Sequence, residues 1–214
     1  MKKSNNLSGK YQEISSPTNV QKVKVVTVGD ISVGKSSLAL RFTKGYFEEL
    51  YKPTVGAVFV FKTITEGNRK ILFQIWDTAG QERFKSLVPM YLRDAKFALL
   101  IYDITDRKTF EAIPTWLNYV TRYAPPDIQV TLVANKIDLQ EYQTIDTRFA
   151  KTFAEEHNIS FEAVSAKTGE NVEKLFNNLA KKLPPEVIVN KHSANHSIKL
   201  TDEKKSLTKC CRIR

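Results

Sequence analysis

Short apolar runs alternate with amphipathic stretches along most of this chain. Four of the apolar runs are long enough for buried strands, at residues 22–29, 97–104, 130–134 and 160–164. Four amphipathic stretches predict helices, near residues 35–43, 107–123, 146–157 and 171–183. Strands and helices that alternate in this order form a parallel sheet covered by helices. The pattern therefore predicts an α/β fold.

Two further segments predict a hairpin. Residues 55–64 and 70–76 are rich in β-branched and aromatic residues, and the Gly67-Asn68 pair between them is a turn signal. We expect these two strands to pair antiparallel. Together with the other runs they predict a six-stranded, mostly parallel sheet with one antiparallel strand and about five helices on its two faces.

One folded domain is predicted at residues 22–185. A chain of 214 residues with 42% hydrophobic residues can bury the core of one ordinary domain. We expect residues 1–21 to form a flexible N-terminal extension, and residues 186–214, which have no periodicity, to form a disordered tail. The last helix should end at Pro184 and Pro185. It has one apolar stripe that should face the core, formed by Val172, Leu175, Phe176, Leu179 and Leu183.

A glycine-containing segment follows the first predicted strand. Its pattern Gly29-x-x-x-x-Gly34-Lys35-Ser36 is that of a phosphate-binding loop, in which backbone N–H groups and a helix N-terminus surround phosphate groups. Lys35 would contact the β- and γ-phosphate oxygens, and the Ser36 hydroxyl would bind Mg²⁺. The alternative is a chance glycine turn, but the segment lies between a strand and a helix, as the motif requires.

The stretch Asn135-Lys136-Ile137-Asp138 identifies the base. Asp138 can accept hydrogen bonds from N1–H and the N2 amino group of guanine, whereas ATP would leave this carboxylate unpaired. Asn135 would meet the other base edge, and the alkyl stem of Lys136 would lie along the ring face. Taken alone, the stretch could equally be a solvated loop.

A second stretch, Ser165-Ala166-Lys167, also follows a predicted strand. The backbone N–H of Ala166 would donate to guanine O6. The two stretches occur in the order that a guanine site requires, which argues against coincidence.

Residues around the predicted hairpin supply the remaining chemistry. Asp77 follows a strand and would reach Mg²⁺ through a water, and Thr54 would be a second hydroxyl ligand in the triphosphate state. Gly80 could offer its N–H to the γ-phosphate. Gln81 is the candidate for orienting the attacking water, since a carboxamide can accept from water and donate to a phosphate oxygen at once. Phe47 lies where an aromatic ring could cover the guanine edge, although it could equally be a core residue.

The apolar runs and the cysteines of this chain argue against a secreted or a membrane-spanning protein. The first 22 residues lack the apolar centre of a signal peptide. The longest apolar run, residues 97–102, is far shorter than the ~20 residues of a membrane-spanning helix. Cys210 and Cys211 are the two cysteines of the chain, so no disulfide framework supports the fold. We therefore expect a location on the cytosolic side of membranes.

The net charge of +10 lies mostly at the two ends of the chain. Residues 1–22 have four lysines and one glutamate, and residues 186–214 have seven Lys or Arg and three Asp or Glu. This placement argues against nucleic acid as the partner. It suits an anionic membrane surface, where each basic residue contributes ~1 kcal/mol. The alternative is a solvated tail that its charge keeps soluble.

With these motifs in this order, residues 22–185 resemble a Ras-superfamily small GTPase and, within it, a Rab protein. The Rab-like segments are residues 54–59, 76–84, 91–95 and 100–105. Residues 86–91 and 180–184 are more similar to the early-endosomal Rab subgroup than to secretory Rabs. The resemblance implies the fold of phosphate-loop NTPases, with GTP and GDP as substrate and product and Mg²⁺ as cofactor. It implies nucleotide contacts from Gly29, Ser32, Val33, Gly34, Lys35, Ser36, Ser37, Phe47, Thr54, Gly80, Asn135, Lys136, Asp138, Ser165, Ala166 and Lys167.

By the same resemblance, Phe59, Trp76 and Tyr91 match the hydrophobic triad that Rab effectors contact in the GTP state. Ordinary packing of sheet and helix is the alternative. The family implies effectors, an exchange factor, a GTPase-activating protein, an escort protein for prenylation and a factor that extracts the GDP form. We expect a monomer without a nucleic-acid partner, on the cytoplasmic face of an endosome or vesicle membrane and cycling with the cytosol.

The pair Cys210-Cys211 resembles tails that receive two geranylgeranyl groups. One lipid chain gives only marginal membrane binding, whereas two chains anchor a protein stably. Cys211 also stands fourth from the end, as in a C-a-a-X box, but Arg212 and Arg214 fit that class poorly. Unmodified thiols are the remaining alternative.

Three residues depart from the family pattern. Ile31 replaces a small or polar residue and would project toward the γ-phosphate, while Leu92 and Asp94 replace a tyrosine and a glycine near the effector-facing surface. The leading hypothesis is a Rab-like switch that recruits effectors to membranes and hydrolyses GTP slowly. One alternative is a membrane-tethered module that Ile31 holds in the GTP state. A soluble nuclear-transport or nucleic-acid GTPase is a third hypothesis, which the paired cysteines disfavour.

Overall fold

The computed structural model describes residues 20–49 and 53–184. The first strand begins at Val20, so the last two residues of the predicted N-terminal extension are part of the sheet. The remainder of that extension lies outside the described residues. The predicted tail, with Cys210 and Cys211, lies outside them as well.

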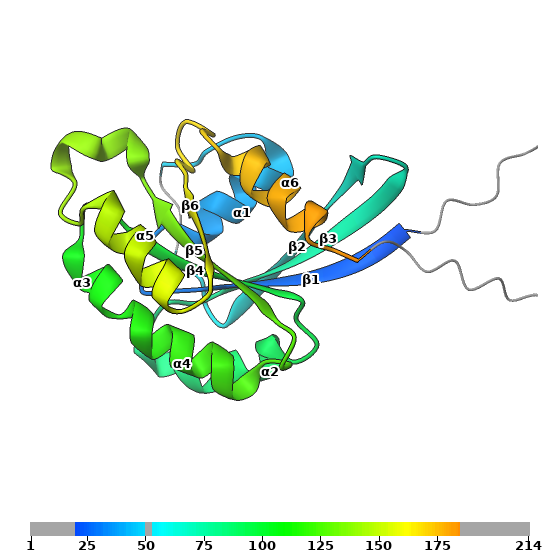
Figure 1. Ribbon diagram of the computed structural model, residues 1–214, viewed down its shortest axis with the longest axis horizontal. Coiled ribbons are helices and arrows are strands. Elements are labelled where there is room, and N and C mark those ends of the chain that lie inside the picture. Colours follow the sequence, from blue (N-terminus) through cyan, green and yellow to red (C-terminus); the bar gives the residue numbers. More distant parts are fainter. Residues whose placement is uncertain (1–19, 50–52, 185–214) are drawn as a thin grey trace, which may run out of the picture. The chain divides into compact units, whose positions relative to one another are not determined.

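Six strands form one sheet in the order β2-β3-β1-β4-β5-β6 (Figure 1). Their bounds are β1 Val20–Val28, β2 Ala57–Glu66, β3 Arg69–Thr78, β4 Phe97–Asp103, β5 Gln129–Asn135 and β6 Ser160–Ala163. β2 pairs antiparallel with β3, and the other neighbouring pairs are parallel. The predicted α/β fold with one antiparallel strand is confirmed.

The predicted hairpin turn joins β2 to β3. Glu66 pairs with Arg69, so the turn consists of Gly67 and Asn68. Gly67 has φ +58°, in the left-handed region that a residue without a Cβ atom adopts readily.

Six α-helices and two 3₁₀ helices lie within the described residues. The α-helices are α1 Lys35–Lys44, α2 Val88–Leu92, α3 Arg107–Glu111, α4 Ile113–Tyr123, α5 Thr147–Glu156 and α6 Val172–Lys181. The 3₁₀ helices are η1 Glu82–Leu87 and η2 Ile137–Tyr142. None of the helices in residues 20–49 and 53–184 is both long enough and apolar enough to cross a bilayer.

Two helices differ from the predicted bounds. The helix predicted at residues 107–123 is divided into α3 and α4 at Ala112. Pro114 lies in the first turn of α4 and has no N–H with which to extend the hydrogen-bond ladder of α3. α6 ends at Lys181, before Pro184, and its last turn tightens as Leu183 donates to the carbonyl of Ala180. The short α2 has no counterpart among the predicted helices.

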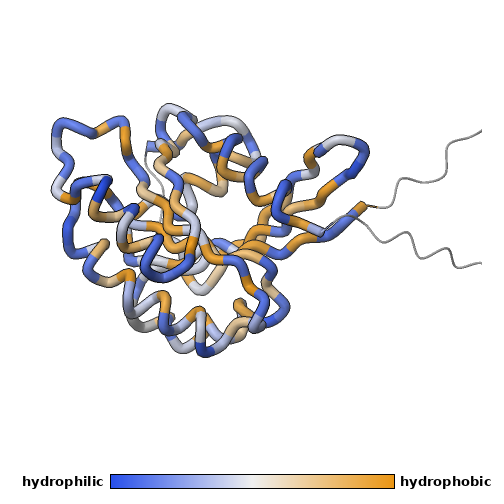
Figure 2. Tube along the Cα trace, viewed as in Figure 1, coloured by the Kyte–Doolittle hydropathy of each residue, from blue (hydrophilic) through white to orange (hydrophobic). Residues whose placement is uncertain are grey.

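The helices cover both faces of the sheet, as predicted. α1 and α6 pack on one face, where Phe42 stacks on Phe176 with ring centroids 3.5 Å apart. α2, α4 and α5 pack on the other face. Alternate residues of β1 face the two cores, since Val25 belongs to the first and Val26 to the second. The five predicted stripe residues are all in the first core, with Leu183 just beyond the end of α6. Figure 2 shows the apolar residues concentrated along the strands between the helices.

Parallel pairing determines where the predicted motifs meet. The carboxyl ends of β1, β3, β5 and β6 lie along one edge of the sheet, because these strands run in the same direction. The four motif segments lie at or directly after those four ends in the chain. In parallel α/β sheets, this edge is where ligands bind.

Candidate functional site

A cavity of about 380 Å³ lies at this edge of the sheet. Its volume is within the range of small-molecule sites, roughly 300–1,000 Å³. Most of the predicted nucleotide-contacting residues line it, namely Ser32, Gly34, Lys35, Ser36, Ser37, Phe47, Thr54, Gly80, Asn135, Lys136, Asp138, Ala166 and Lys167. The predicted catalytic residue Gln81 also lines the cavity. Residues far apart in the sequence are therefore brought to one site.

Four predicted site residues are placed behind the cavity wall. Gly29, Val33, Asp77 and Ser165 are not among the residues that line it. Val33 and Ser165 are fully buried, and Asp77 is 2% exposed. Their side chains or carbonyls instead hold residues that do line the cavity.

The phosphate loop leads directly into α1. Gly34 precedes the helix with φ +91°, and a Cβ atom there would lie 2.3 Å from Nδ2 of Asn135. A side chain at this position would therefore displace Asn135 or the loop. The glycine of the motif is required by this close approach as well as by its backbone angle.

Lys35 lies under the loop with its ammonium group enclosed. Nζ donates to the carbonyls of Gly29 at 2.9 Å and Asp30 at 2.6 Å, and the residue is 5% exposed. Burial lowers the pKa of Lys35 to about 8, while the nearby carboxylates of Asp77 and Asp30 act in the opposite direction. The loop carbonyls thus hold a cationic donor at the cavity wall, where phosphate oxygens could accept from it.

Three oxygen donors converge beside Lys35. Ser36 Oγ donates to Asp77 Oδ2 at 2.5 Å and lies 2.8 Å from Thr54 Oγ1. Thr54 Oγ1 is 3.4 Å from the same carboxylate oxygen, and Thr27 Oγ1 donates to the other at 3.3 Å. Burial raises the pKa of the Asp77 carboxyl, and these hydrogen bonds oppose the rise. Two hydroxyls and a carboxylate are hard ligands, so the set fits the predicted Mg²⁺.

The guanine-recognition residues form a network among themselves. Asn135 is fully buried, and its Nδ2 donates to the carbonyl of Val33 at 2.8 Å. Its Oδ1 accepts from the N–H of Ala166 at 3.1 Å. The amide predicted to meet the base therefore joins the phosphate loop to residues 165–167, and the Ala166 N–H predicted for guanine O6 is directed to Asn135.

The carboxylate of Asp138 is held by Ser165, which does not line the cavity. Ser165 Oγ donates to Asp138 Oδ1 at 2.5 Å and accepts from the N–H of Thr168 at 3.0 Å. Ser165 is thus a support for the acidic residue that lines the cavity. Lys136 forms an ion pair with the buried Asp103 at 2.5 Å, which fixes the direction of its stem.

One residue of this part of the site was missed by the sequence motifs. Arg41 of α1 donates from Nε to the carbonyl of Ala166 at 2.9 Å and from Nη2 to that of Lys167. Its Nη1 donates to the carbonyl of Gly45 at 2.7 Å. One guanidinium therefore links the end of α1 to residues 165–167. Single basic residues are common near the C-terminal ends of helices, so the sequence alone could not have identified this role of Arg41.

The cavity is also lined by residues outside the predicted set of nucleotide contacts and the predicted catalytic residue. They are Ile31, Glu48, Glu49, Pro53, Thr78 and Leu139. Ile31 lies within the phosphate loop, where the sequence already placed it, and it is 48% exposed. Its side chain is thus about half-exposed at the cavity.

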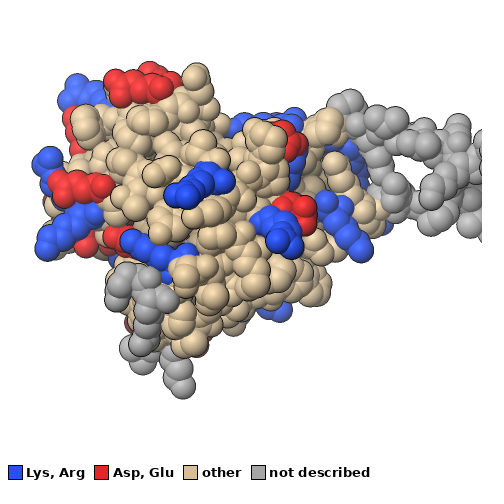
Figure 3. All heavy atoms as spheres, turned by 90° about the horizontal axis from the view of Figure 1, so that it is seen from below, with Lys and Arg blue, Asp and Glu red and all other residues tan. Residues whose placement is uncertain are grey.

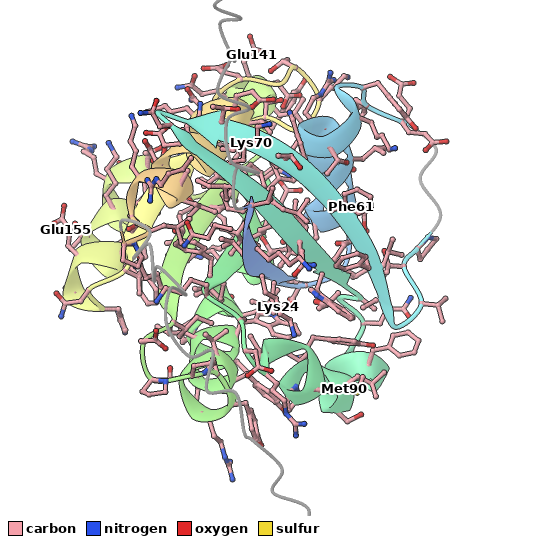
Figure 4. The ribbon with its side chains drawn as sticks, turned by 90° about the vertical axis from the view of Figure 1, so that its right-hand side faces the viewer. Lys24, Phe61, Lys70, Met90, Glu141 and Glu155 are labelled. Carbon is pink, nitrogen blue, oxygen red and sulfur yellow. The ribbon has the colours of Figure 1, made fainter. Side chains whose placement is uncertain are left out.

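An aromatic surface lies on the outer part of the sheet. Phe59 of β2 and Trp76 of β3 have ring centroids 5.3 Å apart, and Trp76 stacks on Tyr91 of α2 at 5.6 Å. Phe61 extends the row, 6.2 Å from Phe59 and 64% exposed. Met90, also exposed, lies on α2 on the same side of the molecule (Figure 4). The predicted triad is therefore in contact and forms part of a larger apolar surface.

Comparisons with known proteins show which family this chain resembles. Residues 24–185 match the Ras family. The chain is 42% identical over 194 residues to the GTP-binding protein ypt5 of Schizosaccharomyces pombe, an alignment that covers 88% of this chain and 92% of that protein.

Proposed function

Because this chain belongs to the Ras family and is a Rab-type small GTPase, we propose that it recruits effectors to an endosome or vesicle membrane while GTP is bound. GTP binding and GTP hydrolysis follow from the family. The single observation that carries the proposal is that the phosphate loop, Ser36, Thr54, Gln81 and Asp138 line one cavity, with Asp77 hydrogen-bonded to Ser36 behind its wall.

Different side chains around the cavity bind the phosphates, the base, the metal ion and the attacking water. Lys35 binds phosphate oxygens, and Asp138, held by Ser165, accepts from guanine. Ser36, Thr54 and Asp77 would hold Mg²⁺, which offsets charge on the phosphates when bound. Gln81 orients the water that attacks the γ-phosphorus, and the bond to the β–γ bridging oxygen breaks. The intrinsic rate is low, because an arginine finger of a partner contributes about 10³–10⁵-fold in such enzymes.

The aromatic surface supports a GTP-dependent effector site. It spans β2, β3 and α2, and α2 follows the segment that contains Gln81. We propose that Phe59, Trp76 and Tyr91 contact the effector, and that Phe61 enlarges the contact. Leu92 does not belong to this surface, because it is buried in the core, whereas Asp94 is exposed with φ +59°.

A nucleic-acid GTPase is disfavoured by family and by surface charge. Figure 3 shows basic and acidic side chains interspersed on the face seen from below the view of Figure 1. A nucleic-acid site would instead gather Lys and Arg on one face.

Membrane attachment through Cys210 and Cys211 is tested by replacing both with serine. We expect protein from its native cell to carry two geranylgeranyl groups by mass spectrometry, and the double variant to move from the membrane fraction to the cytosol. Each single variant should attach less stably than wild type. GTP binding by the double variant is the control, because both cysteines lie beyond the residues that match the family. Unmodified cysteines on wild-type protein would refute this part of the proposal.

Whether Ile31 slows GTP hydrolysis distinguishes a cycling switch from a module held in the GTP state. Ile31 lines the cavity and is 48% exposed, and we propose that its side chain turns toward solvent when a γ-phosphate is bound. We therefore expect Ile31→Ser to change the single-turnover hydrolysis rate by less than about threefold, or ~0.7 kcal/mol in activation free energy. Wild-type protein should carry mainly GDP after purification. GTP on the purified protein, with a rate that rises at least about tenfold in Ile31→Ser, would favour the GTP-held module.

A further inference from the structure

Trp116 of α4 reaches the phosphate loop from outside the cavity. The residue is fully buried, and its indole N–H donates to Asp30 Oδ1 at 2.7 Å. Asp30 is the second residue of the phosphate loop, but neither Asp30 nor Trp116 lines the cavity. The contact therefore acts on the loop from outside the cavity.

The backbone of Asp30 lies where two parts of the site meet. Its carbonyl accepts from Lys35 Nζ at 2.6 Å. A Cβ atom on Gly80 would lie 2.4 Å from the Asp30 carbonyl carbon and oxygen and 2.4 Å from Lys35 Nζ. Lys35, Asp30 and Gly80 are thus in close contact. A restraint on the Asp30 side chain limits where this carbonyl, and with it the Lys35 ammonium, can lie.

The same indole ring also touches the segment that follows Gln81. Lys85 of η1 places its Nζ 4.9 Å from the centroid of the Trp116 ring. An ammonium over the face of an indole is the strongest form of the cation–π contact. Trp116 therefore contacts the phosphate loop through its N–H and the Gln81 segment through its ring face.

We propose that Trp116 is a positioning residue that couples the phosphate loop to the Gln81 segment. The hydrogen bond to Asp30 holds the carbonyl that orients Lys35, and the contact with Lys85 makes the indole sensitive to the position of residues 82–87. Because α4 is packed into the core of the sheet, it serves as the fixed support for both contacts. This inference rests on the proposed function, since it concerns the retention and hydrolysis of a guanine nucleotide.

A double-mutant cycle tests the hydrogen bond. Trp116→Phe keeps a buried aromatic ring but removes the N–H, and Asp30→Ala removes the acceptor from a half-buried position. Each single variant should release GDP about tenfold faster than wild type, the effect of losing a hydrogen bond to a charged group. The double variant should be no faster than the faster single variant, because both changes break the same contact. Tyr119→Phe, on the same helix, is the matched control and should release GDP at the wild-type rate.

Trp116 fluorescence tests the contact with Lys85. The chain has two tryptophans, so in a Trp76→Phe background the emission comes from Trp116 alone. We expect this emission to differ between the GDP state and a non-hydrolysable GTP analogue, and we expect Lys85→Met to remove most of the difference. This measurement keeps Trp116 in place, so it does not depend on how well Trp116→Phe folds.

The outcomes distinguish the inference from the proposed function. Wild-type protein that binds neither GDP nor GTP would overturn the proposed function, and the inference with it. Wild-type binding together with unchanged GDP release in Asp30→Ala and Trp116→Phe would overturn the inference alone. Additive effects in the double variant would do the same, since they would show that the two residues act separately. So would Trp116 emission that is the same in both nucleotide states.

Discussion

Replacing Asp138 with alanine should lower the affinity for GTP by ~10²–10⁴-fold and abolish the preference for GTP over ATP. The carboxylate is positioned at the cavity by the Ser165 hydroxyl at 2.5 Å. It can accept two hydrogen bonds from guanine, each worth ~1.5–3 kcal/mol because the acceptor is charged. Adenine lacks the two donors, so the wild-type site leaves the carboxylate unpaired when ATP binds.

Competition titration with a fluorescent guanine nucleotide would measure both effects. Ser165→Ala is the matched comparison, because it keeps the carboxylate but removes its support, and we expect a loss of about tenfold. Equal displacement of the probe by GTP and ATP on wild-type protein would contradict the assignment of Asp138. So would an Asp138→Ala variant that binds GTP as tightly as wild type.

Replacing Gln81 with leucine should lower the hydrolysis rate in the presence of a Rab-type activating protein by ~10²–10³-fold. Gln81 lines the cavity with Gly80, and a Cβ atom added to Gly80 would lie 2.4 Å from Lys35 Nζ. Gln81 is therefore at the end of the cavity where the phosphates are expected. Leucine has a similar volume but can neither accept from water nor donate to a phosphate oxygen.

Single-turnover hydrolysis of GTP-loaded protein with Mg²⁺, with and without the activating protein, measures this effect. Gln140→Leu makes the same chemical change at an exposed position of η2 and should respond to the activator as wild type does. GTP affinity should be similar in all three proteins. If wild type itself hydrolysed no GTP with the activator present, a module held in the GTP state would be the better account.

Local patterns in the sequence predicted the fold and most of the segments that line the cavity. Alternation of apolar runs and amphipathic stretches is a local property, and it predicted the order of strands and helices and the turn at Gly67-Asn68. Likewise, the functional groups of each motif lie within a few consecutive residues, so each motif could be recognised without knowledge of the fold. At one position where the prediction differed, a single residue changes a local rule, as Pro114 does between α3 and α4.

The contacts that hold the site together could not be predicted in the same way. Asn135 bonds to residues 102 positions earlier and 31 positions later, and Arg41 reaches Ala166 across 125 positions. Trp116 and Asp30 are 86 positions apart. The residues proposed for the chemistry were thus identified from the sequence alone. Which of them line the cavity, and which support it from behind, was decided by the strand order and by side-chain packing, because these bring distant segments within bonding distance.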